Sequence, residues 1–190
     1  MAAIATHETI TISSALASAE EVLAAFTWHK RELIWLAEFL TGDELTASAC
    51  VADAGNLSEN NKEDEICEEG VQSWPREATI RSALDMKRAR IAELCAAYEH
   101  VDCRPQQHTP LSLEKIELVV TESEVIRRHL DSLCRFVLIL CGVERHSVRD
   151  VASLLGISKH AVQAAYNNAL EFLEVICCQA ILEEYGCAVA

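Results

Sequence analysis

Residues 147–173, SVRDVASLLGISKHAVQAAYNNALEFL, decide the fold of this chain. They hold two runs of apolar residues at helical spacing, one on each side of Gly156. The first run consists of Val148, Val151, Ala152, Leu154 and Leu155, and the second of Val162, Ala165, Tyr166, Ala169, Leu170 and Leu173. This pattern predicts two amphipathic helices joined by a tight turn.

Polar residues and a glycine mark the ends of these two helices. Ser147, with Asp150 three residues later, is typical of a capped helix start. Gly156 suits the left-handed conformation that ends a helix, and Ser158 is a favourable N-cap for the next one. Ala152 is small where the helices must approach each other. These features predict a helix-turn-helix, whose second helix normally enters the DNA major groove, with an ordinary αα-hairpin as the alternative.

The composition of the 190-residue chain favours an all-α protein, because 51% of its residues are hydrophobic and it has only 6 Gly and 3 Pro. The length suits one large domain or two small ones. The formal net charge of −14 counts against strong non-specific DNA affinity, since phosphate contacts need local positive charge.

Targeting and metal signals are weak. No apolar run is long enough to span a bilayer, and the N-terminal residues lack the basic start and apolar core of a signal peptide. We therefore expect a cytoplasmic protein with no membrane partner and without structural disulfides. Cys95, His100, Cys103 and His108 have a spacing that zinc ligands sometimes have, but their order matches no zinc motif and Cys95 fits a buried helical stripe. We expect no metal and no other cofactor.

The N-terminal half is predicted to be helical. One helix over residues 18–41, ended by Gly42, places Trp28 and Trp35 near one side, which favours core positions over a ligand platform. A second helix is expected over residues 44–54. The acidic residues 55–70 predict a solvated loop or a weak helix, and a surface that repels DNA or binds a basic partner is the alternative.

Trp74 and Pro75 mark the start of a long helix over residues 76–98. Up to residue 90 its basic residues are opposed only by Glu77 and Asp85. Such a helix suits phosphate contact, although a solvated charged face is the alternative. The candidate DNA-binding residues here are Arg76, Arg81, Lys87, Arg88 and Arg90.

Two prolines in residues 101–112 predict a linker between two small helical domains, residues 18–100 and 113–175, with a tail at 176–190. In the second domain we expect a short helix over residues 113–120. Thr121 and Glu124 then predict a capped helix that runs to about residue 141 and ends at Gly142.

Several motifs in the second domain resemble a known family. Leu155-Gly156-Ile157-Ser158 matches L-G-I-S, while Asp150-Val151-Ala152 stands for E-I-A and Ala161-Val162 for T-V. These motifs belong to region 4 of the bacterial sigma-70 family of RNA polymerase initiation factors. The small extracytoplasmic-function type, with regions 2 and 4 only, fits the length. An L-P-x3-R-x-V-L-x-L helix is matched by Leu130, Arg135, Val137, Leu138 and Leu140, with Asp131 in place of proline.

Region 2 is similar to residues 40–54, LTGDELTASACVADA, although the family's acidic pair and its Q-E are replaced. The resemblance implies that this segment docks on RNA polymerase, with Asp43 and Asp53 as its candidate binding residues. It also places the helix of residues 76–90 where the family reads and melts the promoter −10 element.

The second helix of the helix-turn-helix carries the other candidate DNA contacts. Glutamine and asparagine can hydrogen-bond adenine, and serine and lysine can hold phosphate. Its candidate contacts are Ser158, Lys159, His160, Gln163 and Asn167, with Asn168 on the same polar face. One full positive charge among them predicts thin electrostatic anchoring.

We expect a divergent sigma-like transcription factor whose partners are promoter DNA, the RNA polymerase core and, as a further class, an anti-sigma or other regulatory protein. The first alternative is a sigma-fold interaction protein that has lost DNA or polymerase binding, and the second is a stand-alone helix-turn-helix repressor. The sequence holds no phosphate-cradling glycine loop and no H-E-x-x-H motif, so we do not expect an enzyme.

Overall fold

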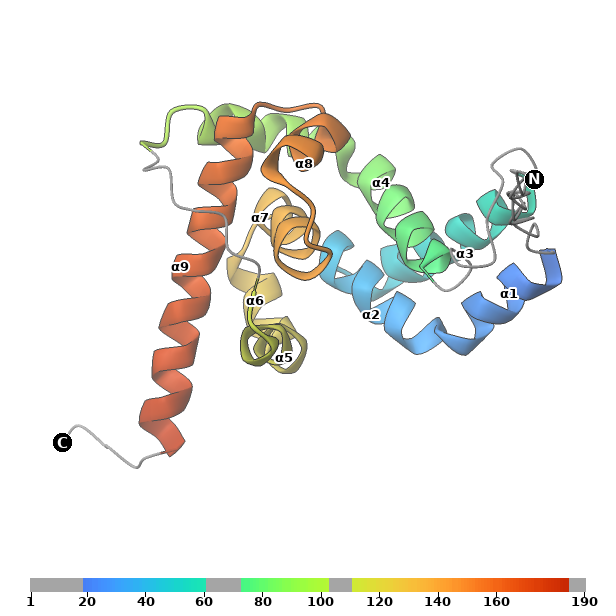
Figure 1. Cartoon of the computed structure of the whole chain (residues 1–190), viewed down its shortest axis with the longest axis horizontal. Helices are drawn as coiled ribbons and strands as arrows, with labels where there is room; N and C mark the ends of the chain where they lie inside the picture. The colour runs from blue at the N-terminus through green and yellow to red at the C-terminus, as the bar shows by residue number, and fades with distance from the viewer. Residues whose placement is uncertain (1–18, 61–72, 103–110, 185–190) are drawn as a thin grey trace, which may run out of the picture.

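The computed structural model describes residues 19–60, 73–102 and 111–184, and these residues form nine α-helices, one π-helical segment and no strand (Figure 1). The all-α fold is therefore confirmed. None of the helices described is long and apolar enough to cross a membrane. The elements are α1 (Ala19–Trp28), α2 (Lys30–Thr41), α3 (Glu44–Asn60), α4 (Trp74–Tyr98), α5 (Leu113–Thr121), α6 (Ser123–His129), α7 (Ser132–Val137), η2 (Leu138–Val143), α8 (Val148–Leu155) and α9 (Lys159–Glu184).

The first predicted helix is two helices in the structure. The backbone leaves helical geometry at His29, and α1 and α2 run in different directions on its two sides (Figure 1). Trp28 and Trp35 consequently do not share one side of a single helix. Trp35 is half-buried and stacks on Phe39, whereas Trp28 is 86% exposed. The predicted core position of Trp28 is wrong.

Local signals set the junction between α2 and α3. Gly42 is left-handed, with φ 96°, and its N–H donates to the carbonyl of Glu38 at 2.8 Å, so it ends α2 as predicted. Asp43 then accepts a 2.7 Å hydrogen bond from the backbone N–H of Thr46 in the first turn of α3. The third helix continues to Asn60, six residues beyond its predicted end.

The single helix predicted over residues 121–141 is wrong. It consists of α6, α7 and η2, because Leu130 is extended (φ −88°, ψ 133°) and Asp131 starts a new helix by accepting a 2.8 Å hydrogen bond from the N–H of Cys134. Arg135 stabilises this break. Its Nη1 donates to the carbonyls of Arg127 at 2.9 Å and Leu130 at 2.8 Å.

The two predicted boundaries of that helix are also wrong. Thr121 donates its hydroxyl to the carbonyl of Glu117, so it belongs to α5 and does not cap α6. Gly142 lies inside η2 and does not end it. A side chain at Gly142 would meet Leu111 at 2.8 Å, so the glycine is needed for this close approach.

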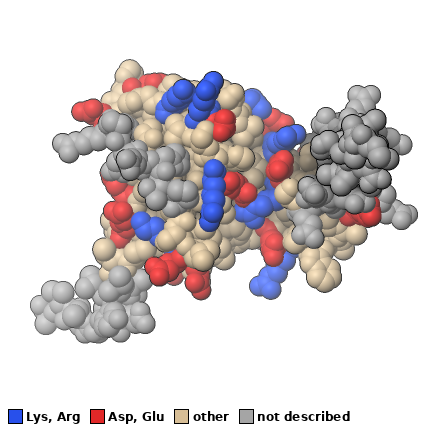
Figure 2. Space-filling model, viewed as in Figure 1, with Lys and Arg blue, Asp and Glu red and all other residues tan. Residues whose placement is uncertain are grey.

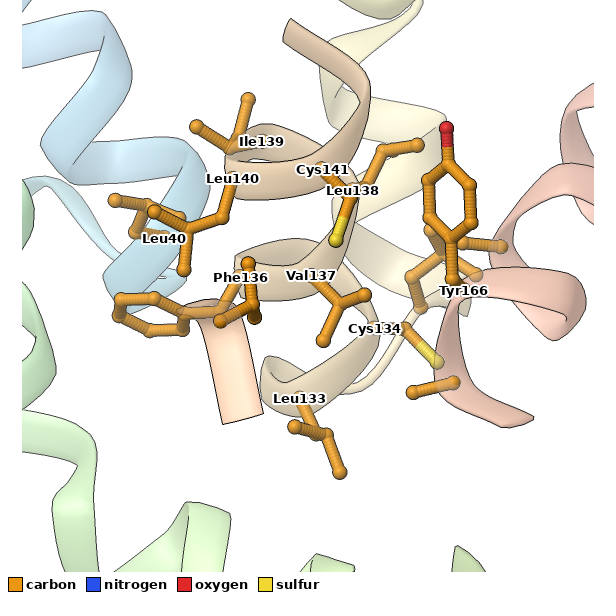
Figure 3. Packing of buried hydrophobic residues seen from close by; sticks show 14 of the residues in the cluster. Leu40, Leu133, Cys134, Phe136, Val137, Leu138, Ile139, Leu140, Cys141 and Tyr166 are labelled. Carbon is orange, nitrogen blue, oxygen red and sulfur yellow. The ribbon is translucent and has the colours of Figure 1, made fainter. Parts of the chain in front are cut away.

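The main hydrophobic cluster draws on both halves of the chain. In Figure 3, α7 and η2 lie between Leu40 of α2 and Tyr166 of α9, and their side chains fill the space on both sides. Leu133, Phe136 and Leu138 are completely buried there. The two predicted domains thus share one core. The linker between them stays a prediction, since residues 103–110 lie outside the described part of the chain.

Candidate nucleic-acid interface

Helices α8 and α9 form the pair that residues 147–173 predicted. Ser147 caps α8 by accepting a 3.2 Å hydrogen bond from the N–H of Asp150. Gly156 is left-handed, with φ 68°, and ends the helix. The hydroxyl of Ser158 then accepts a 3.0 Å bond from the N–H of Ala161 in the first turn of α9. These caps are as predicted, whereas the DNA-binding role of the pair stays a prediction.

The polar side of α9 is mostly engaged within the molecule. His160 Nε2 lies 2.9 Å from the carbonyl of Val101, three residues beyond the end of α4. Gln163 donates to Asn167 at 2.8 Å, and Asn167 is only 9% exposed. Of the five predicted contacts on this helix, Lys159 alone is exposed without a hydrogen bond or ion pair within the described residues. In this conformation Asn167 is inaccessible to a base.

A polar cluster holds α9 against α4 and α7. The hydroxyl of Tyr98 donates to Oδ2 of Asp131 at 2.7 Å and lies 2.9 Å from Sγ of Cys134. Asn168 of α9 donates to the same hydroxyl at 3.0 Å. Burial raises the pKa of Tyr98 and raises the pKa of Cys134 to about 12, so both stay protonated at neutral pH. The cluster therefore positions helices and offers no nucleophile.

A basic groove borders the first turns of α8 and α9. It has a volume of about 510 Å³ and its charged side chains are Arg145, Arg149 and Lys159, with His146 beside them. All four side chains are exposed, and none of the three lysine and arginine side chains is in an ion pair within the part of the chain that the structure describes. No carboxylate lines the groove. The groove thus offers an anion three positive charges that no ion pair compensates within the described residues.

The sequence analysis missed Arg145 and Arg149. Arg145 has a left-handed backbone (φ 62°), which is uncommon outside glycine and turns the chain into α8. Arg149 follows the cap residue Ser147 in the first turn of that helix. The available signal was the run VERHSVR, with two arginines and a histidine around the start of α8.

The predicted basic face of α4 is largely compensated. Arg76 forms an ion pair with Glu144, which lies 68 residues away in sequence. Arg88 pairs with Asp85 at 2.7 Å and Arg90 with Glu93 at 2.9 Å, both within the helix. Of the other two predicted contacts, Arg81 lies over the Trp74 ring at 5.8 Å and Lys87 is partly buried. Figure 2 shows Lys and Arg interspersed with Asp and Glu on the face in view, without a continuous basic surface.

The two candidate polymerase contacts, Asp43 and Asp53, are both exposed. Hydrogen bonds from the side chain and backbone of Thr46 lower the pKa of Asp43, which caps α3. Asp53 lies in the middle of α3. Asp43 thus has a structural role in addition to its predicted one.

The zinc alternative gains no support. Cys103 and His108 lie outside the described residues, and within the described ones no group of three or more His, Cys, Asp or Glu side chains is placed to hold a metal. Cys95 lies 3.6 Å from a carboxylate oxygen of Glu99.

The fold and this interface define an all-α protein in which a capped helical pair borders a basic groove. No family model, curated protein or solved structure matches the chain.

Proposed function

We propose that the chain is a divergent sigma-like transcription factor that binds promoter DNA together with RNA polymerase. It contributes no catalytic chemistry of its own. The α8–α9 pair contacts DNA, and the basic groove holds the phosphate backbone beside the first turn of α9. The resemblance to sigma regions 2 and 4 supports RNA polymerase as the partner, with Asp43 and Asp53 as the candidate residues that bind it.

The observation that carries this proposal is the basic groove. Arg145, Arg149 and Lys159 converge on one concave surface without a compensating acid. Phosphate contacts of this kind fix a protein on DNA, whereas base contacts specify the sequence. The groove lies at the first turn of α9, where a recognition helix approaches base edges. Lys159 belongs to both the groove and the predicted set of contacts.

The test is DNA affinity as a function of salt. Fluorescence anisotropy with a labelled promoter-length duplex, titrated at salt concentrations from about 25 to about 300 mM, gives the slope of log K against log salt. Replacing Arg145, Arg149 and Lys159 by alanine removes three cations and reduces that slope by about 2.7. A matched triple variant, R88A/R90A/R128A, changes the net charge equally on side chains that are ion-paired within their own helices. We expect it to change the slope by less than about 1.

Two outcomes count against the proposal. No binding at about 25 mM salt, with or without core polymerase, refutes promoter binding. If the salt slope is reduced only in the matched triple variant, the DNA contact lies at the surface of Arg88, Arg90 and Arg128 and not at the groove. Polymerase binding is tested separately with Asp53→Asn, because Asp43 also caps α3.

The second candidate is an interaction protein of the same fold without DNA binding. The ion pairs of Arg76, Arg88 and Arg90 and the burial of Asn167 favour it, because they engage four predicted DNA contacts within the molecule. The net charge of −14 acts in the same direction. A folded chain that binds polymerase or a regulatory protein but no DNA at low salt supports this candidate.

A further inference from the structure

A second cleft shares no lining residue with the basic groove, although Glu144 of the cleft and Arg145 of the groove are consecutive in the chain. It has a volume of about 800 Å³, within the usual range of small-molecule sites. Four segments enclose it: α2 and α4 from the first half of the chain, and α5 and the end of η2 from the second. Its apolar lining consists of Trp35, Ile116, Val119, Val120 and Val143.

Of the four charged side chains at this cleft, Arg31 is the one without an ion pair within the described residues, which leaves its donors in excess. Glu144 is already bound by Arg76, and a carboxylate oxygen of Glu32 accepts from His29 at 3.2 Å. Arg31 is exposed and in no ion pair within the described residues, so its guanidinium keeps five donors available.

Trp35 adds to this excess. Its indole Nε1 is buried without a hydrogen-bond partner in the part of the chain described. A buried donor without an acceptor is unfavourable, and Trp35 also lines a small neighbouring pocket with Glu38 and Arg127. The donors at the cleft thus favour a ligand with hydrogen-bond acceptors, and the aliphatic side chains of α5 favour a ligand with an apolar part.

We propose that this cleft binds a small amphipathic carboxylate, with the carboxylate at Arg31 and the apolar body against Ile116, Val119 and Val120. A guanidinium binds a carboxylate through two parallel hydrogen bonds, which suits an exposed arginine at the rim of an apolar cleft. The site is distinct from the basic groove and its ligand is independent of DNA, so this inference stands or fails separately from the proposed function.

The experiment is isothermal titration calorimetry of the full chain with decanoate as the probe. Decanol and decyltrimethylammonium have the same apolar body with a neutral or a cationic head. We expect saturable binding of one decanoate per chain, and at least about fivefold weaker binding of the other two probes, because a charge-assisted hydrogen bond is lost.

Two variants locate the ligand, each with a matched control. Arg31→Ala weakens decanoate binding about fivefold, whereas Arg90→Ala, on an exposed arginine of α4, leaves it unchanged. Val120→Trp fills the cleft from a side chain that is 50% exposed and weakens binding about tenfold or more, whereas Val175→Trp, 54% exposed on α9, does not. If Val120→Trp unfolds the chain in circular dichroism, Arg31→Ala decides alone.

Three results overturn the inference. They are the absence of saturable decanoate binding, equal affinity for the three probes, and affinity that Arg31→Ala leaves intact. A chain that sediments as a dimer, and becomes a monomer in Val120→Trp, assigns the cleft to a second copy instead of a small molecule.

Discussion

Tyr98→Phe tests the cluster that fixes α9 on the rest of the molecule. The substitution keeps the buried ring and removes only the hydroxyl, which donates to Asp131 at 2.7 Å and accepts from Asn168 at 3.0 Å. It also removes the 2.9 Å contact with Sγ of Cys134. No cavity larger than one oxygen atom is created, so the effect reports the hydrogen bonds.

The expected destabilisation follows from the three partners. A hydrogen bond to a charged group contributes about 1.5–3 kcal/mol. Asp131 is only partly buried and keeps its bond from the N–H of Cys134, so the lower end applies. Asn168 is exposed and exchanges its lost bond for water. We therefore expect the free energy of unfolding to fall by about 1.5 kcal/mol and Tm by about 3–6 °C.

Urea unfolding followed by circular dichroism measures this change. Ser153→Ala removes an exposed hydroxyl from α8 and is the control, with an expected effect within about 0.5 kcal/mol. Combining Tyr98→Phe with Asn168→Ala gives a double-mutant cycle with a coupling of at least about 0.5 kcal/mol. A Tyr98→Phe effect as small as that of the control, or strict additivity with Asn168→Ala, would falsify the role assigned to the cluster.

Two further perturbations follow from the backbone and from the buried thiols. Gly156→Ala lowers the free energy of unfolding in urea by about 1 kcal/mol, because φ is 68° and no neighbour lies within 4 Å of the added Cβ. Gly55→Ala, inside α3, instead raises it by about 0.5–1 kcal/mol. Effects of the same sign contradict the capping role of Gly156. Burial raises the pKa of Cys134 and Cys141 to about 12, above an unfolded value of about 8.5, so the unfolded chain releases these protons first. The two protonated thiols contribute fully to the free energy of unfolding below pH about 8.5. This contribution is lost as pH rises towards about 12, at about 1.4 kcal/mol per pH unit for each thiol. Urea midpoints that do not fall between pH about 8 and pH about 10 contradict this expectation.

The features predictable from sequence are those that act within one helical turn. Ser147, Gly156 and Ser158 each satisfy or release backbone groups of neighbours three or four residues away, so their roles follow from residue type and spacing. Gly42 belongs to the same class. The helix break at residue 130 carried a comparable signal, because Asp131 is a good N-cap, but the apolar run after it favoured one continuous helix.

The features that sequence reasoning missed depend on residues brought together by packing. Arg76 meets Glu144 across 68 positions, and Nη2 of Arg135 reaches the carbonyl of Leu40 at 3.4 Å across 95. Neither periodicity nor local charge counting contains such pairs. Asn168 was placed on an outer polar face because helical periodicity identifies faces without saying which of them a distant tyrosine will contact.

The arrangement of α9 also bears on how much DNA affinity the proposed function can draw from this chain alone. Asn167 and Asn168 serve packing, so phosphate contacts at the groove carry most of the DNA affinity proposed here. Three cations give a salt slope of about −2.7, and such binding weakens about 40-fold between 50 and 200 mM salt, against about 10³–10⁵ for proteins with six to ten phosphate contacts. Because the whole chain has a net charge of −14, the proposal predicts weak DNA binding by the chain alone. If RNA polymerase, bound through α3 as proposed, supplies the missing contacts, core polymerase raises the DNA affinity of the unchanged chain much more than that of Asp53→Asn.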